Sequence, residues 1–94
     1  MYLVISQWKA KPGRESDFEA VGLKMRAALR ETPGVTFVEA IDGPDGIYAV
    51  HGYEDEATYK RVVEEENGPF AQAAAQHGIE DVADWMSSVR GNTK

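Results

Sequence analysis

The chain has 94 residues, a formal net charge of −6 and no cysteine. This length fits one domain, because two halves would each be too small to bury a hydrophobic core. The lack of cysteine excludes disulfides, thiolate metal ligands and cysteine nucleophiles. An acidic chain without a basic stripe repels phosphates, so no nucleic-acid partner is expected. No apolar run approaches the ~20 residues of a membrane span. Polar residues also follow Met1–Ile5 too closely for a signal peptide, so we expect a cytoplasmic protein without membrane contact.

Apolar side chains on both faces mark Met1–Lys9 as a strand that is covered on both sides. Tyr2, Val4 and Trp8 would point one way and the alternate residues the other. Pro12-Gly13 then ends the strand.

Apolar side chains at three- and four-residue steps predict a helix from about Arg14 to Glu31, ended by Thr32-Pro33-Gly34. Val35–Ile41 and Ile47–Tyr53 are rich in branched and aromatic residues. The turn formers between them predict an antiparallel hairpin.

The second half begins with a helix that opens at Asp55 or Glu56 and is interrupted at Asn67-Gly68-Pro69. A further helical piece carries Phe70 and His77 on one apolar stripe, and a glycine stops it.

The segment Ile79–Arg90 fits both helical spacing and strand alternation. We choose a strand, because it completes the order strand-helix-strand-strand-helix-strand of a ferredoxin-like α+β domain. The domain is then 1–90, and 91–94 is a flexible C-terminal tail.

The motifs of phosphate-binding loops, dinucleotide-binding folds and serine hydrolases are all missing. The two histidines, His51 and His77, lie on different predicted elements, which argues against a metal site. From the residues alone, His51 is better explained by a hydrogen bond within the sheet, and His77 by capping the negative end of its helix, than by a role in a pocket. The aromatic residues Tyr53 and Tyr59 have core packing as their alternative role.

Three stretches resemble the antibiotic biosynthesis monooxygenase family: Gln7–Arg14, Thr32–Val35 and Gly52–Ala57. The resemblance covers about Met1 to His77. It implies a ferredoxin-like βαββαβ domain that pairs through its sheet face into a dimeric α+β barrel. Tyr2, Val4 and Trp8, or their alternates, would fill the seam. A homodimer also suits a domain that buries only roughly 60% of its unfolded surface when alone.

The resemblance also implies oxidation of a quinol- or anthrone-like aromatic by molecular oxygen, with no metal or flavin. Tyr53 and Tyr59 occupy the positions of two aromatic residues in anthrone-oxidising members, where they would position the substrate. His51 or His77 would take the substrate proton, and Ser6, Trp8 and Phe70 would contact the substrate.

Several family residues are replaced in this chain. An asparagine four residues before the first aromatic is Ala49, and a histidine of quinol-oxidising members is replaced in Gly68-Pro69-Phe70. The residues matching the set of haem-degrading relatives are Ser6 or Gln7, Arg61 and Ala74, which argues against haem as a cofactor.

Two hypotheses therefore remain open. The first is a cofactor-independent monooxygenase with oxygen as co-substrate. The second is a non-catalytic barrel of the same fold that binds a small apolar ligand or serves as an interaction module.

Overall fold

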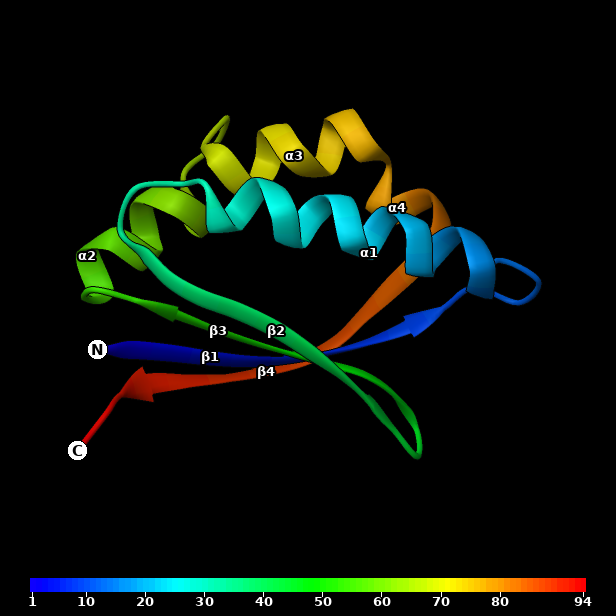
Figure 1. Cartoon of the computed structure of the whole chain (residues 1–94), viewed down its shortest axis with the longest axis horizontal. Coiled ribbons are helices and arrows are strands. Elements are labelled where there is room, and N and C mark those ends of the chain that lie inside the picture. Colours follow the sequence, from blue (N-terminus) through cyan, green and yellow to red (C-terminus); the bar gives the residue numbers. More distant parts are fainter.

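A computed structural model describes residues 1–94 as one four-stranded antiparallel sheet with helices on a single side (Figure 1). The strand order is β2-β3-β1-β4, so β1 and β3 are central and β2 and β4 are edges. This is the ferredoxin-like α+β order that the sequence predicts. The expectation for the fold is thus confirmed for one protomer.

The elements are β1 (Tyr2–Ala10), α1 (Glu15–Arg30), β2 (Val35–Gly43), β3 (Gly46–Tyr53), α2 (Glu56–Tyr59), a π-helical turn η1 (Lys60–Glu64), α3 (Pro69–His77), α4 (Ile79–Val82) and β4 (Ala83–Asn92). The first four agree with the predicted elements to within two residues at each end. No helix is both long enough and apolar enough to cross a membrane.

The ambiguous segment Ile79–Arg90 divides into the helical turn α4 and the strand β4. Ile79 and Val82 are buried on one side of this turn, which explains the helical spacing. β4 also continues through Asn92, and Thr93 N–H donates to Met1 O at 2.8 Å. The predicted boundary at residue 90 therefore lies two residues before the strand ends.

Strand register decides which side chains face the helices. Tyr2, Val4 and Trp8 pair with buried or half-buried residues of β3 and point toward the helices. Their alternates, including Leu3 and Ile5, point to the opposite face. The predicted cover over both faces is not found within one protomer, because all helices lie on one side of the sheet (Figure 1).

A side-chain cap begins the helical segment after β3. The Asp55 carboxylate accepts hydrogen bonds from Thr58 N–H at 2.8 Å and from Thr58 Oγ1 at 2.7 Å. These bonds lower the pKa of Asp55. The cap fixes the start of α2 and thereby the direction in which Tyr59 leaves it.

The buried core consists of two clusters between the sheet and the helices. One is built around Tyr53, Tyr59 and Val62, and the other around Phe18 and Met25. Phe70 is half-buried and packs against both. The core is therefore divided along its length.

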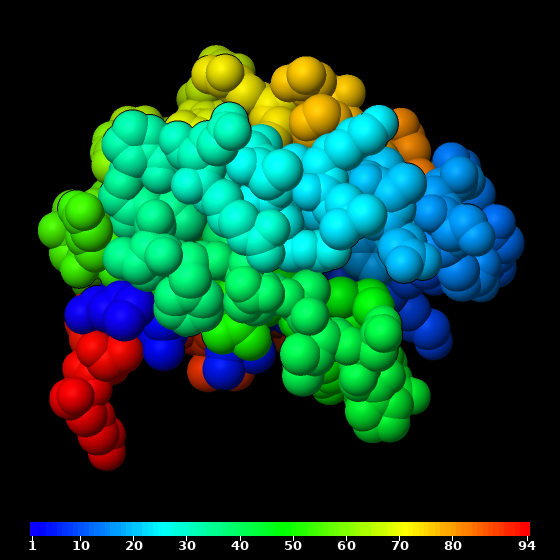
Figure 2. Space-filling model, viewed as in Figure 1, coloured from blue at the N-terminus to red at the C-terminus, as the bar shows by residue number.

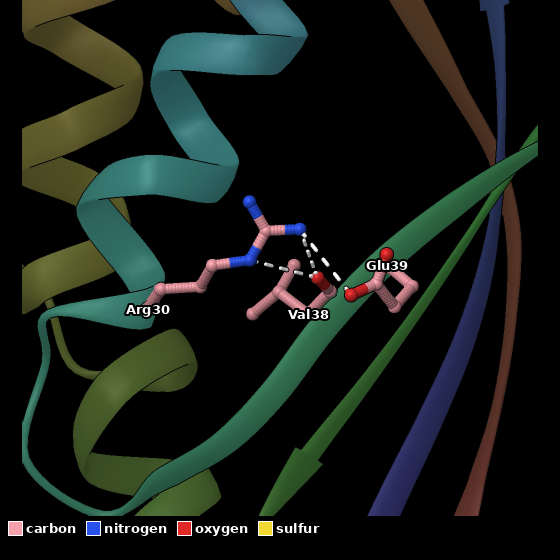
Figure 3. A network of polar contacts seen from close by, with 3 residues as sticks. All are labelled: Arg30, Val38 and Glu39. Carbon is pink, nitrogen blue, oxygen red and sulfur yellow. Dashed lines mark hydrogen bonds and ion pairs between the residues drawn. The ribbon is translucent and has the colours of Figure 1, made fainter.

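Arg30 ties the end of α1 to the edge strand β2 (Figure 3). Its Nε and Nη2 donate to Val38 O at 3.1 and 2.6 Å, and Nη2 lies 3.5 Å from Glu39 Oε1. A strand edge with free carbonyls invites pairing with another chain. The Arg30 side chain donates to one such carbonyl, that of Val38, and so makes it less available to another chain.

Candidate functional site

A cavity of about 420 Å³ lies between the sheet and the helices. Thirteen of its 20 lining residues are hydrophobic. Val4 and Leu29 of the first core cluster and Phe18 and Met25 of the second all contribute to its wall. The cavity thus borders both clusters. Its size and mostly apolar wall are typical of a small-molecule site.

Two tryptophan–serine pairs lie side by side on the sheet wall of the cavity. Trp8 Nε1 donates to Ser6 Oγ at 3.2 Å on β1, and Trp85 Nε1 donates to Ser88 Oγ at 3.0 Å on β4. Trp8 is aligned with Trp85, and Ser6 with Ser88, across the two strands. Each serine accepts from an indole and keeps its own O–H free to donate to a ligand.

His51 and Tyr53 form a buried pair on β3. The distance between His51 Nδ1 and the Tyr53 hydroxyl is 2.6 Å, and the rings meet edge to face. His51 is 8% exposed and lines the cavity, whereas Tyr53 is fully buried behind it. Burial lowers the pKa of His51 to about 4 and raises the pKa of Tyr53. The pair is therefore uncharged at neutral pH.

Tyr59 brings a phenol to the cavity from the wall opposite the sheet. Its ring packs against Tyr2 and Tyr53, with centroids 5.2 and 5.5 Å apart. The Arg90 guanidinium carbon lies 5.7 Å from the Tyr59 ring centroid. Burial raises the pKa of Tyr59, and the nearby Arg90 partly opposes this. The π-helical turn η1 follows directly and places Val63 on the cavity wall; such turns are frequent at functional sites.

The structure brings together most of the residues singled out from the sequence. Five of the seven line the cavity: Ser6, Trp8, His51, Tyr59 and Phe70. Tyr53 does not line it but supports His51 from behind. His77 is not among the lining residues; it is the last residue of α3, directly before Gly78, which has a left-handed backbone with φ 71°.

Sequence reasoning missed the contribution of β4, which supplies Trp85, Ser88 and Arg90 to the cavity. Strict alternation would place Trp85 and Ser88 on opposite faces. A bulge opposite the step between Gln7 and Trp8 shifts the register and brings both to the same face. The pattern of side chains alone carries no signal for such a shift.

A second hollow of about 540 Å³ lies between α1 and the β2–β3 hairpin. Only five of its 13 lining residues are hydrophobic, and charged side chains such as Lys9, Glu15 and Asp42 surround it. No group of three or more histidine, aspartate or glutamate side chains lies close enough together to hold a metal ion. The apolar cavity is accordingly the candidate site.

No family model matches the chain, and no curated protein matches its sequence. Solved structures do match it. SnoaB, a cofactor-independent oxygenase from Streptomyces nogalater, has a TM-score of 0.75 at 12% identity over 99% of this chain and 92% of its own. Rv0793 from Mycobacterium tuberculosis has a TM-score of 0.76 at 14% identity, covering 99% and 94%.

A candidate antibiotic biosynthesis monooxygenase from Deinococcus radiodurans is similar to the same degree. Its TM-score is 0.76 at 10% identity, over 100% of this chain and 93% of its own. The TM-scores show a common fold, and at identities this low the comparison extends no further than the fold. The chain has the ferredoxin-like fold found in solved structures of antibiotic biosynthesis monooxygenases.

Proposed function

We propose that the chain is a cofactor-independent monooxygenase that oxidises a quinol- or anthrone-like aromatic molecule with molecular oxygen. The observation that carries the proposal is the mostly apolar cavity between the sheet and the helices, which has His51, Tyr59 and Ser6 on its wall. The fold shared with SnoaB, a cofactor-independent oxygenase, supports the same reaction class.

The reaction needs little from the protein beyond a shaped and largely dry cavity. An electron-rich phenol or anthrone loses a proton, and the resulting anion passes an electron to oxygen. Recombination forms a carbon–oxygen bond. One oxygen atom stays in the product as a carbonyl, and the other leaves as water with two hydrogens of the substrate. The substrate supplies all the electrons, and apolar walls keep bulk water from the radical pair.

In this proposal the residues on the cavity wall have different roles. Tyr59 and Phe70 contact the flat face of the substrate, and Ser6 and Trp8 contact it from the sheet. His51 is the imidazole assigned to the substrate, because His77 does not line the cavity. Tyr53 acts through His51, because the Tyr53 hydroxyl is hydrogen-bonded to the imidazole and has no access to the cavity.

Oxygen uptake by the purified protein with a panel of hydroquinones and anthrones tests this proposal. We expect uptake above the buffer control that a metal chelator does not abolish. His51→Leu should lower the rate about tenfold or more, as expected for a group that stabilises charge in the transition state. Tyr59→Leu, which removes the ring that positions the substrate, should lower it as well. His77→Gln is the matched control and should keep the rate. No uptake with any substrate of the panel contradicts the oxygenase for those substrates.

The alternative is a non-catalytic barrel of the same fold that binds a small apolar ligand. Ala49 and Phe70, which replace an asparagine and a histidine of oxidising relatives, both lie on the cavity wall. The wall is therefore more apolar than the resemblance implies. Saturable binding of an anthrone without oxygen uptake would favour this alternative.

We propose, in addition, that two copies pair through the open face of the sheet. Ile5, Ile41 and Val89 are 45%, 61% and 72% exposed, although they are large and apolar. Ile5 and Val89 are aligned across β1 and β4 on the face away from the helices. Figure 2 shows the underside of the molecule hollowed between the C-terminal end (red) and the β2–β3 hairpin (green). A second copy would cover this surface.

A further inference from the structure

The His51–Tyr53 pair has a definite arrangement of hydrogens. The two residues are two apart on β3, and both side chains face the helices. The Tyr53 hydroxyl is fully buried and has no hydrogen-bond partner other than His51 Nδ1. The position of the proton on the neutral imidazole therefore depends on whether the buried Tyr53 hydroxyl donates or accepts this hydrogen bond.

If Nδ1 carried the imidazole proton and donated it to the phenol oxygen, the Tyr53 O–H would itself be left without an acceptor. A buried donor without a partner is strongly disfavoured. If Tyr53 donates to Nδ1 instead, both groups are satisfied. The neutral imidazole then carries its proton on Nε2. Burial keeps the ring neutral at physiological pH by lowering the pKa of His51.

His51 Nε2 has access to the cavity. No buried polar side-chain atom in the structure lacks a hydrogen-bond partner. Nε2 has no partner within the protein, so it is one of the atoms that keep an accessible surface. Since His51 lines the cavity, the free N–H of Nε2 is available to whatever occupies that space.

We propose that His51 Nε2–H is a fixed hydrogen-bond donor that selects ligands with an acceptor oxygen, namely an aromatic ketone or a phenolate. Tyr53 is a positioning residue that holds the imidazole in this tautomer. The inference rests on the proposed function in taking the same cavity as the ligand site. It changes the role expected for the histidine, because an Nε2–H cannot accept the substrate proton.

A donor at this position is useful in the proposed oxidation. Negative charge collects on the ketone or phenol oxygen as the proton of the substrate leaves. A hydrogen bond to that oxygen stabilises the anion beside the mostly apolar wall of the cavity. The proton itself then passes to solvent, which reaches the exposed part of the cavity wall at Trp85.

The first experiment compares binding of 9-fluorenone and fluorene, which differ in the ketone oxygen. Binding is measured by the quenching of tryptophan fluorescence, because Trp8 and Trp85 both line the cavity. We expect the protein to bind fluorenone about five- to tenfold more tightly, the usual net value of one neutral hydrogen bond. His51→Leu should remove this preference while fluorene still binds. His51→Gln, whose amide can donate, should retain part of it, and His77→Gln should retain all of it.

A spectroscopic measurement distinguishes a hydrogen bond from a change in cavity shape. The carbonyl stretch of bound fluorenone should lie at lower frequency in the wild-type protein than in His51→Leu. Nitrogen NMR of His77→Gln, in which His51 is the only imidazole, should show a proton on Nε2 and none on Nδ1. Tyr53→Phe should give a mixture of both tautomers and a smaller ketone preference.

Equal binding of the two probes, failure of both to bind, or a ketone preference that survives His51→Leu would overturn the proposal. A proton on Nδ1 would do the same. None of these measurements requires turnover. Absence of oxygen uptake would therefore contradict the oxygenase and leave the donor role standing. Oxygen uptake without a ketone preference would contradict the donor role and leave the oxygenase standing.

Discussion

His51 lies among apolar side chains, and this placement links its protonation to the stability of the fold. Its pKa is about 4 in the folded protein against 6.5 in the unfolded chain. Between these values the unfolded chain binds more protons, so the free energy of unfolding falls as pH decreases from 6.5 toward 4. The total loss is about 3 to 4 kcal/mol once the pH lies below 4, because each unit of pKa difference corresponds to roughly 1.4 kcal/mol. Above pH 6.5 the residue contributes no such loss.

His51→Gln should remove this part of the pH dependence. Urea denaturation at several pH values measures it, and the difference between wild type and variant should grow between pH 6.5 and 4. His77→Gln is the control and should follow the wild-type curve. Asp55 does not interfere, because its lowered pKa affects stability only below its ordinary value of 3.8. Parallel curves for wild type and His51→Gln would show that the imidazole is not buried.

Tyr53→Phe tests the hydrogen bond without changing the packing of the ring. The variant leaves the buried Nδ1 of His51 without a donor, so we expect a loss of about 1 kcal/mol in the free energy of unfolding. Tyr48→Phe is the matched control. The Tyr48 hydroxyl also makes one hydrogen bond, to Asp45 Oδ1 at 2.9 Å, but in an exposed setting. Chemical denaturation should show the larger change for Tyr53→Phe; equal changes would contradict the buried pair.

At the scale of elements, the first part of the fold could be predicted well because local rules decide it. The stripe of Glu15–Arg30 and the turn between β2 and β3 depend on neighbours within a few residues. Ile79–Asn92 could not be predicted in the same way. Its division into α4 and β4 depends on pairing with β1, more than 70 residues earlier.

The candidate site also combines residues that local sequence patterns predict with residues that depend on long-range strand pairing. Tyr59 and Phe70 could be named from their places on apolar stripes, and both lie on the cavity wall. Arg90 could not, because its place beside Tyr59 depends on the register of β4. The proton arrangement of His51 depends on Tyr53 being fully buried, which no spacing of residues predicts.

The connection between α1 and β2 makes an element-scale prediction. Gly34 has φ 90°, and a Cβ placed on it would overlap the Thr58 methyl group at the start of α2. Gly13 has a similar φ of 79° with open space around it. Gly13→Ala should therefore show only the backbone cost of about 1 kcal/mol, and Gly34→Ala a larger loss. Thermal unfolding of the two variants measures the difference, and equal losses would mean that α2 moves away freely.

At the scale of the whole molecule, one protomer leaves an apolar sheet face open while a cavity occupies the middle of its core. A second copy would cover that face, and a two-fold interface would bury the same set of residues in both copies. We therefore expect sedimentation at micromolar concentration to show twice the 10.4 kDa of the chain. A single species of 10.4 kDa would contradict the dimer.

Val89→Glu tests whether the open sheet face forms the dimer interface. Val89 is 72% exposed on β4, next to Ile5, so the substitution disturbs no packing within the protomer. It would bury a carboxylate from each copy in the proposed interface, which is strongly unfavourable without a partner charge. Sedimentation should show a folded monomer. Leu23→Glu is the matched control, since Leu23 is 59% exposed on α1, on the helical side of the molecule, and its variant should stay dimeric. If Val89→Glu remains a dimer and Leu23→Glu becomes a monomer, the copies pair through the helices and the open sheet face has another use.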